Sequence, residues 1–231
     1  MVTVLLPWLP APSRLAAFDA VERWYRENLA DADVRTVDPD GAVFSLARAR
    51  NLGIAGVEDP DEVVVIGDAD TVPQRDPLLA VLAAAASSGR VHLPYTAYHW
   101  LGAAGTAQYL DGRDGADCAF DLVRGACSGV YVTTPATWHA HGGQDERFRG
   151  WGYEDAAWYL AHETLLGEPP RREPGLVFAL HHQAEERAGA QYDANAALMQ
   201  RYREAAGDPG RMRQLVDEDA SAANALVRPG A

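Results

Sequence analysis

The chain has 231 residues, of which 48% are hydrophobic and 23% are charged, and its formal net charge is −13. This length and composition suit one globular domain with a sizeable core, and they exclude a collagen-like, repetitive or disordered chain. The acidic balance argues against a nucleic-acid partner, because binding a phosphate backbone needs clustered basic residues.

No apolar run approaches the roughly 20 residues that a membrane helix needs, so we expect no membrane span. The opening stretch MVTVLLPWLPAP lacks a basic region and is interrupted by prolines, so we interpret it as a core strand rather than a secretory signal. We therefore expect the protein to be cytoplasmic. Two cysteines, Cys118 and Cys127, are too few for a disulfide framework or a cysteine-based zinc site.

The first part of the chain alternates between strand-like and helix-like patterns. Apolar runs predict strands at 2–6, 34–37, 62–66 and 90–94. Apolar residues at helical spacing predict a helix at 15–29, with Ser13 as N-cap. Helical composition predicts a second helix at 44–57, and Asp76-Pro77 opens a third at 78–86. This order is that of a right-handed doubly wound α/β unit.

The second part is less regular. We predict strands at 130–133 and 176–180 and helices at 154–166 and 194–206. Between them, the long segment 95–129 is rich in Gly, Ala and Asp, which favours a functional loop or lid. The tail 207–231 has a composition compatible with partial disorder.

The third predicted strand ends in two acids one residue apart, in the stretch VVVIGDADTVP at 63–73. In an extended segment Asp68 and Asp70 point the same way, and ligands of open α/β sheets bind beyond the carboxyl ends of the strands. Two adjacent carboxylates repel unless a cation lies near them, and oxygen ligands suit Mg²⁺ or Mn²⁺. Alternatively, the two acids only shape a turn.

The same stretch also fits the D-x-D-x-[T/V] nucleophile motif of haloacid-dehalogenase-like phosphatases, in which Asp68 would attack phosphorus. That family needs a later basic residue, usually lysine, and the chain contains no lysine. Asp68 also follows two earlier βα units, whereas the family places its motif on an early strand. We therefore favour the metal site.

A second motif, GGQDERFRGWGYED at 142–155, resembles the Gly-Gly, Asp-Glu-x-Phe, Gly-Trp-Gly-x-Glu-Asp signature of the β-1,4-galactosyltransferase C-terminal region and of chondroitin-polymerase-like enzymes. ARARNLGIAG at 47–56 resembles the helix before the metal strand of those enzymes, and LHHQ at 180–183 resembles the segment with their late metal histidine. The resemblance covers roughly residues 40–185. It implies the GT-A glycosyltransferase fold, a single doubly wound, mostly parallel sheet flanked by helices.

The resemblance also implies a nucleotide-sugar donor, most often a UDP-sugar, and a Mn²⁺ or Mg²⁺ cofactor. Asp70 would bind the metal directly, and Asp68 would contact the donor's ribose or a metal-bound water. His182 would complete the protein ligands, with His181 as the alternative because the strand register is open.

Four more residues would contact donor or acceptor by the same resemblance. Arg48 and Arg50 would reach the diphosphate, Asp38 would accept a hydrogen bond from uracil or ribose, and Trp151 would offer a flat surface to a sugar ring. The plainer interpretations are an exposed helix residue for one of the two arginines, an Asp-Pro turn for Asp38 and a loop anchor for Trp151.

Glu154 and Asp155 stand where the helix 154–166 should begin, and the helix dipole favours their ionised forms. By resemblance, Asp155 would take the proton of the acceptor hydroxyl while Glu154 orients the acceptor. The pair reads Glu-Asp rather than the Glu-Asn of related retaining polypeptide N-acetylgalactosaminyltransferases, which predicts inversion. Helix capping is the plainer interpretation.

We therefore expect one domain, 1–231, with a nucleotide-binding half at 1–94 and an acceptor and catalytic half at 95–185. The acceptor could be a glycan, a protein or a small molecule. One alternative is a sugar-phosphate nucleotidyltransferase, although no glycine-rich, Arg/Lys-bearing nucleotide loop is found near the N-terminus. Another is a non-catalytic sugar-binding module with the same fold.

Overall fold

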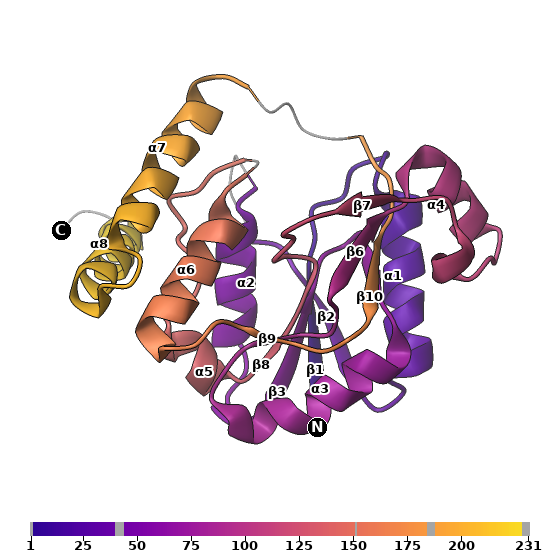
Figure 1. Cartoon of the computed structure of the whole chain (residues 1–231), viewed down its shortest axis with the longest axis horizontal. Helices are drawn as coiled ribbons and strands as arrows, with labels where there is room; N and C mark the ends of the chain where they lie inside the picture. Colours follow the sequence, from indigo (N-terminus) through magenta and orange to yellow (C-terminus); the bar gives the residue numbers. More distant parts are fainter. Residues whose placement is uncertain (1, 40–43, 151, 184–187, 228–231) are drawn as a thin grey trace.

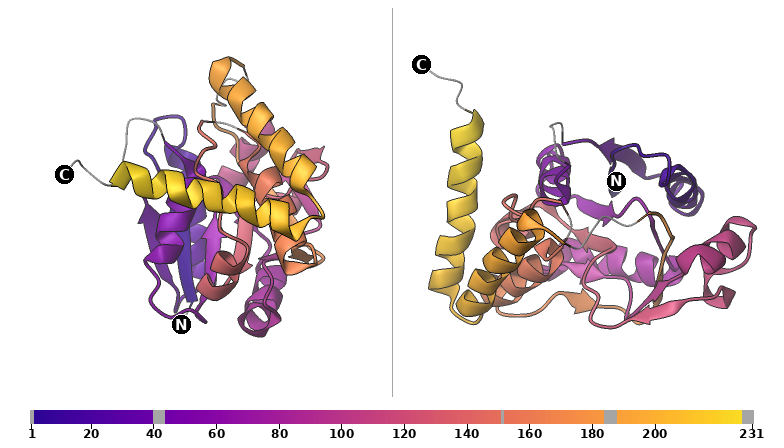
Figure 2. Two further views of the ribbon diagram at one scale, coloured as in Figure 1. Left: turned by 90° about the vertical axis from the view of Figure 1, so that its left-hand side faces the viewer. Right: turned by 90° about the horizontal axis from the view of Figure 1, so that it is seen from above.

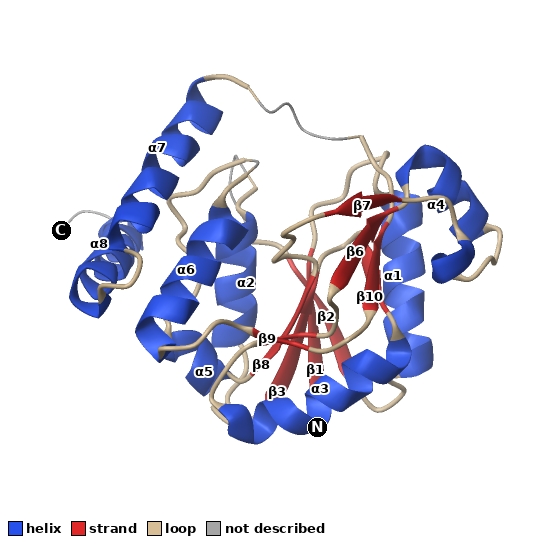
Figure 3. Cartoon of the chain, in the orientation of Figure 1, coloured by secondary structure: helices blue, strands red, loops and turns tan. Residues whose placement is uncertain are grey.

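Two β-sheets form the centre of the molecule, and helices pack around them (Figures 1 and 3). The computed structural model describes residues 2–39, 44–150, 152–183 and 188–227. Strands and helices alternate along the first part of the chain, so the predicted α/β class is confirmed.

Six strands form the larger sheet: β1 (Val2–Pro7), β2 (Asp33–Val37), β3 (Val63–Gly67), β5 (His92–Leu93), β8 (Val130–Thr133) and β9 (Arg171–Arg172). Their order is β2-β1-β3-β8-β5-β9. β1 pairs in parallel with β2 and β3, and β5 pairs in parallel with β9. β8 runs antiparallel to both of its neighbours.

Helices cover both faces of this sheet. α1 (Leu15–Asn28) and α2 (Leu46–Ala55) lie on opposite sides of it, and α3 (Arg75–Ser88) packs against β3 and β8 (Figure 1). Burial on both faces accounts for the uninterrupted apolar run of β3. The N-cap of α1 is Arg14 rather than the predicted Ser13, because the residues before α1 already form a turn.

A smaller sheet contains β4 (Thr71–Pro73), β6 (Ala97–Trp100), β7 (Asp121–Val123) and β10 (Leu176–Ala179), in the order β4-β10-β6-β7. The prediction of a single sheet was wrong in this respect. After β3 the chain turns, and the turn is closed by a hydrogen bond of 3.1 Å from the Thr71 N–H to the Asp68 carbonyl. β4 therefore leaves the larger sheet and pairs with β10.

The segment 95–129, in which the composition favours a functional loop or lid, is largely made of regular elements. It contains β6, α4 (Gly102–Leu110), a 3-10 turn (Gly115–Asp117) and β7. The two strands are too short to stand out as local patterns. β6 is paired with β10, which lies far along the chain, so its formation depends on tertiary contacts that local propensity does not report.

The C-terminal part adds α5 (Pro135–Ala140), α6 (Glu154–Leu166), α7 (Ala190–Ala205) and α8 (Pro209–Val227). α7 and α8 are joined by a short turn and both contact α6. They diverge at a wide angle, since α7 lies across the view of Figure 1 whereas α8 is seen nearly end-on, and α8 projects from the body (Figure 2). We call this pair of helices the C-terminal hairpin. The tail is thus helical from 209 to 227, because Met212, Leu215 and Val216 join a second apolar cluster with α6 and α7. Within the described ranges, no helix is long and apolar enough to cross a membrane.

Candidate active site

The two acids of the DAD motif lie at the carboxyl end of β3. The Asp68 N–H donates to the Gly129 carbonyl at 2.7 Å, and the Thr71 hydroxyl donates to the same carbonyl at 2.7 Å. These bonds fix the turn on which both acids sit. Their side chains have different partners, however: Asp68 contacts Arg50, and Asp70 contacts His182.

Arg50, on α2, is fully buried and lies at the centre of the site. Its guanidinium donates to Asp68 at 2.5 Å, to Asp155 at 2.6 Å and to Gln144 at 2.8 Å, and its Cζ lies 4.9 Å from the centre of the Tyr131 ring. Burial alone would lower the pKa of Arg50, but Asp68 and the other neighbours raise it well above its ordinary value. The guanidinium therefore stays charged and joins the acid at the end of β3 to the acid at the start of α6.

The resemblance implies a contact of Arg50 with the donor's diphosphate. In the structure both terminal nitrogens of the guanidinium are bonded to protein groups, and Arg50 holds the two acids in place.

Asp155, in the first turn of α6, is anchored through one oxygen. Its Oδ1 accepts hydrogen bonds from Arg50, from the Tyr131 hydroxyl and, at 3.5 Å, from Gln144. Burial holds the pKa of Tyr131 well above its usual value, so that hydroxyl remains a donor. Oδ2 of Asp155 accepts no hydrogen bond from the described part of the chain, which leaves it able to receive a proton.

Burial changes the charge expected for two neighbouring acids. It raises the pKa of Glu154 to about 8, with a further contribution from the Asp155 carboxylate. It also raises the pKa of Asp68 to about 6, although Arg50 opposes the shift. For Glu154, burial therefore outweighs the helix dipole that favours ionisation. At neutral pH its carboxyl group is mostly protonated and can donate a hydrogen bond.

The glycine-rich loop, residues 142–153, leads into this pair of acids. Gly143 has φ +70°, and a Cβ there would lie 2.6 Å from Oδ1 of Asn51, so only glycine fits. Tyr153, at the N-cap of α6, also has a positive φ of 76°. A bulky residue in this conformation is strained, and such strain is often found beside functional groups.

Asp70 and His182 meet at the end of the smaller sheet. Nε2 of His182 lies 2.9 Å from Oδ2 of Asp70, and Nδ1 lies 2.8 Å from the Gln183 carbonyl. The hydrogen bond to Asp70 raises the pKa of His182. His181 is exposed, and its N–H donates to the Thr106 hydroxyl at 2.7 Å. Of the two histidines that the sequence left open, His182 is the one that faces Asp70.

The described residues do not form a complete metal cage, since they contain no group of three or more His, Cys, Asp or Glu side chains that could hold an ion. Asp70 and His182 provide one oxygen and one nitrogen. Mg²⁺ is commonly held by one or two carboxylates together with phosphate oxygens and waters. The pair therefore fits a cation shared with a diphosphate ligand.

The remaining predicted residues lie outside this network. Asp38 follows β2 and is exposed, and Arg48 is half-buried on α2, with its backbone N–H bonded to the Ser45 hydroxyl. Neither takes part in the contacts that join Asp68 to Asp155. Trp151 lies outside the described residues.

Three residues of the site were not predicted. Tyr131, on β8, belongs to an ordinary strand pattern, and nothing in the sequence marks it. Asn51 and Gln144 lie within the two quoted motifs but received no role. Asn51 bonds both the N–H and the carbonyl of Gln144, at 3.0 and 2.7 Å, and accepts a bond from the Trp138 indole at 3.0 Å. The side chain of Asn51 therefore fixes the start of the glycine-rich loop.

Solved structures with a similar fold support the sequence resemblance. The structure is similar to a mutant of Drosophila β1,4-galactosyltransferase 7 in complex with manganese, UDP-Gal and xylobiose. The TM-score is 0.57, with 15% identity, over 84% of this chain and 78% of that chain. The catalytic domain of the Drosophila enzyme with xylobiose gives 0.56, with 16% identity, over 84% and 79% of the two chains.

GalNAc-T7 with UDP, GalNAc and Mn²⁺ is also similar, with a TM-score of 0.50 and 10% identity, over 95% of this chain and 55% of that chain. No protein-family model and no curated protein sequence matches the chain. At these identities the similarity establishes the fold, and the chain has the fold of the GT-A glycosyltransferases.

Proposed function

We propose that this chain is a metal-dependent glycosyltransferase that transfers a sugar from a UDP-sugar to an acceptor hydroxyl with inversion. The observation that carries the proposal is the Arg50 network. It holds Asp68, beside the predicted metal residue Asp70, and Asp155 around a single buried guanidinium, and one oxygen of Asp155 accepts no hydrogen bond from the described residues. The similar structures with manganese and UDP-Gal, or with UDP and Mn²⁺, support the choice of donor.

Asp70 and His182 would hold the Mn²⁺ or Mg²⁺ ion, and Asp68 would contact the donor's ribose or a metal-bound water. When bound there, the cation neutralises charge on the departing diphosphate. Asp38 and Arg48 remain candidates for contacts with the base and the diphosphate, and Trp151 for stacking on a sugar ring.

The proton moves to Asp155. As the acceptor oxygen bonds to the anomeric carbon, the bond from that carbon to the donor phosphate oxygen breaks, and Oδ2 of Asp155 takes the hydroxyl proton. Arg50, Tyr131 and Gln144 donate to Oδ1, so Oδ2 is the oxygen that would face the acceptor. Attack from the side opposite the leaving group inverts the anomeric centre. Protonated Glu154 donates a hydrogen bond to the acceptor.

Transfer by an Asp155→Asn variant tests this proposal. The wild-type protein is first assayed with Mn²⁺ and a panel of UDP- and GDP-sugars against xylobiose and a set of other acceptors. A general base typically contributes about 10²- to 10⁴-fold, so Asp155→Asn should lose about that factor in kcat while UDP binding with Mn²⁺ is retained. Asp76→Asn is the matched control, because the Asp76 side chain is 92% exposed on α3.

Other results would favour the alternatives. Transfer that is unchanged in Asp155→Asn would show that this carboxylate is not the base. UDP-sugar binding without transfer to any acceptor would favour a sugar-binding module. Release of pyrophosphate from UTP and a sugar phosphate would favour a nucleotidyltransferase.

A further inference from the structure

The C-terminal hairpin, α7 and α8, contacts the glycine-rich loop along most of its length. Among the described residues, the loop backbone makes few hydrogen bonds to itself: Phe148 donates to the Asp145 carbonyl at 3.3 Å, the Arg147 N–H donates to the Asp145 side chain at 2.9 Å, and Gly143 donates to the Trp138 carbonyl of α5 at 2.9 Å. Several of its glycines have positive φ values, so the backbone has wide conformational freedom. Its shape must therefore be fixed by other elements.

Asn195, on α7, fixes the end of the loop. It is buried, with 1% of its surface exposed. Its Oδ1 accepts from the Arg149 N–H at 3.3 Å, and its Nδ2 donates to the Arg149 carbonyl at 2.8 Å and to the Gly152 carbonyl at 3.3 Å. One turn earlier on α7, the Tyr192 hydroxyl lies 3.0 Å from the Tyr153 hydroxyl. The hairpin thus bonds the residues directly before Glu154 and Asp155.

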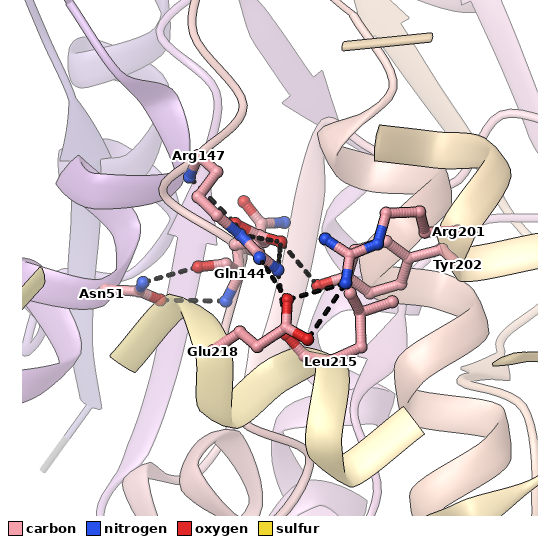
Figure 4. Close-up of polar contacts among 8 residues, drawn as sticks. Asn51, Gln144, Arg147, Arg201, Tyr202, Leu215 and Glu218 are labelled. Carbon is pink, nitrogen blue, oxygen red and sulfur yellow. Dashed lines mark hydrogen bonds and ion pairs between the residues drawn. The ribbon is translucent and has the colours of Figure 1, made fainter. Parts of the chain in front are cut away.

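A polar cluster fixes the middle of the loop (Figure 4). The Tyr202 hydroxyl donates to Asp145 at 2.8 Å, and Arg147 donates to both oxygens of Asp145, at 2.9 and 2.7 Å. Arg147 also donates to the Leu215 carbonyl at 2.8 Å and to Glu218 at 3.1 Å. The side chains that hold Asp145 and Arg147 therefore come from both helices of the hairpin.

Apolar packing adds to this contact. Phe148 of the loop shares the second apolar cluster with Met199 and Tyr202 of α7 and with Met212 and Leu215 of α8. At the start of the loop, a Cβ on Gly142 would lie 2.2 Å from a methyl group of Val216. The hairpin therefore touches the loop at its start, middle and end.

We propose that this hairpin is a positioning element for the acceptor side of the site, with Asn195 as its main positioning residue. By fixing Arg149 and Gly152, Asn195 sets the position of Glu154 and Asp155 at the start of α6. The inference rests on the proposed function. The contacts that the described residues make with the side chains of Asp68, Asp70 and His182 do not come from the hairpin, so its effect should fall on transfer rather than on UDP binding.

Asn195→Asp tests the proposal, because it keeps the size of the side chain and replaces the N–H donors that face two carbonyl groups. Asn28→Asp is the matched control: Asn28, on α1, donates to the Trp24 carbonyl at 2.9 Å, away from the loop. Three properties are compared: amide hydrogen exchange at Arg149, calorimetric binding of UDP with Mn²⁺, and kcat and KM for the sugar acceptor that the wild type uses.

The expected result is faster exchange at Arg149 and a loss of about 10- to 100-fold in kcat/KM for the acceptor, because small misplacements of reacting groups have effects of this size. The Kd of UDP with Mn²⁺ should change by no more than about twofold, because a twofold change in Kd is a smaller change in binding free energy than the loss of a contact. Asn28→Asp should leave all three properties unchanged.

Transfer by Asn195→Asp equal to that of Asn28→Asp would overturn the inference and leave the proposed function standing. A wild type that neither binds UDP with Mn²⁺ nor transfers sugar would overturn both. If Asn195→Asp does not fold, the transfer rate of Tyr192→Phe tests the inference in its place, because this variant removes only the hydroxyl that contacts Tyr153. A loss of transfer of about threefold or more, with UDP binding retained, supports the inference, and unchanged transfer overturns it.

Discussion

A buried arginine that joins two acids is the residue-scale feature on which the site depends. Removing one partner of such a group is costly, because the charges that remain are buried and uncompensated. Arg50 has no exposed surface, whereas the side chains of Asp68 and Asp155 are 17% and 21% exposed. If Arg50 is removed, the cost in stability should therefore come from the two carboxylates, which stay partly buried without their positive partner.

Arg50→Met is expected to lower the free energy of unfolding by about 3 kcal/mol, the lower end of the range for a broken buried ion pair, because both acids keep some contact with water. Urea denaturation at pH 7 measures the effect. Arg48→Met, two residues earlier on α2 and only half-buried, is the control and should change stability by about 0.5 kcal/mol or less. Equal effects of the two variants would contradict the central place of Arg50.

The raised pKa of Glu154 gives a prediction about pH. The folded protein binds the proton up to about pH 8, whereas the unfolded chain releases it near the ordinary value of 4.5. Glu154 therefore lowers stability progressively as pH rises from about 4.5 to 8. Glu154→Gln removes this effect, so its stability relative to wild type should rise between pH 5.5 and 8.5, as measured by urea midpoints. A difference that does not vary with pH would contradict the assignment.

At the scale of elements, the glycine-rich loop depends on backbone shapes that side chains forbid. Gly143 and Gly150 both have positive φ values, but a Cβ at Gly143 would meet Asn51, whereas a Cβ at Gly150 would meet none of the described residues within 4 Å. Substituting Gly150 should therefore change stability only through the backbone conformation, whereas substituting Gly143 should also disturb the packing against Asn51.

Gly150→Ala should lower stability by about 1–2 kcal/mol, the cost of a left-handed conformation for an L-residue. Gly143→Ala should lower it further, because the hydrogen bonds of Asn51 to Gln144 must also shift. Thermal or urea unfolding of both variants measures the difference. Equal losses would mean that the contact of Gly143 with Asn51 does not constrain the loop.

The elements that the sequence predicts well are those with long local patterns. β3 is a continuous apolar run, and α1 and α3 have apolar residues at helical spacing. The short strands β4, β6 and β7 were missed, because they exist through pairing with β10 or with one another. α8 was missed because its burial depends on α6 and α7, which its own sequence does not specify.

The site shows the same division. The resemblance of the motifs to a known family assigned Asp68, Asp70, Asp155 and His182 to one site. In the structure Asp68 and Asp155 both contact Arg50, and Asp70 contacts His182. The sequence could not reveal that Arg50 is enclosed by protein groups, because the burial of a charged side chain depends on the tertiary fold. The pKa shift of Glu154 was unpredictable for the same reason.

At the scale of the whole molecule, three parts of the chain meet around the site. The first half supplies Asp68, Asp70 and Arg50, the smaller sheet supplies His182, and α6 supplies Glu154 and Asp155. The hairpin of α7 and α8 holds the loop that leads into α6. In the proposed mechanism, donor binding and acceptor activation therefore depend on different elements, which Arg50 joins.

Calorimetric titration with UDP tests the central claim most directly, because it needs no knowledge of the acceptor. We predict that UDP binds in the presence of Mn²⁺, that chelating the metal weakens binding by about tenfold or more, and that Asp70→Asn has a similar effect, each corresponding to about 1.4 kcal/mol or more. Binding that is equally tight without a divalent ion, or no binding of UDP by the folded wild-type protein, would contradict the account.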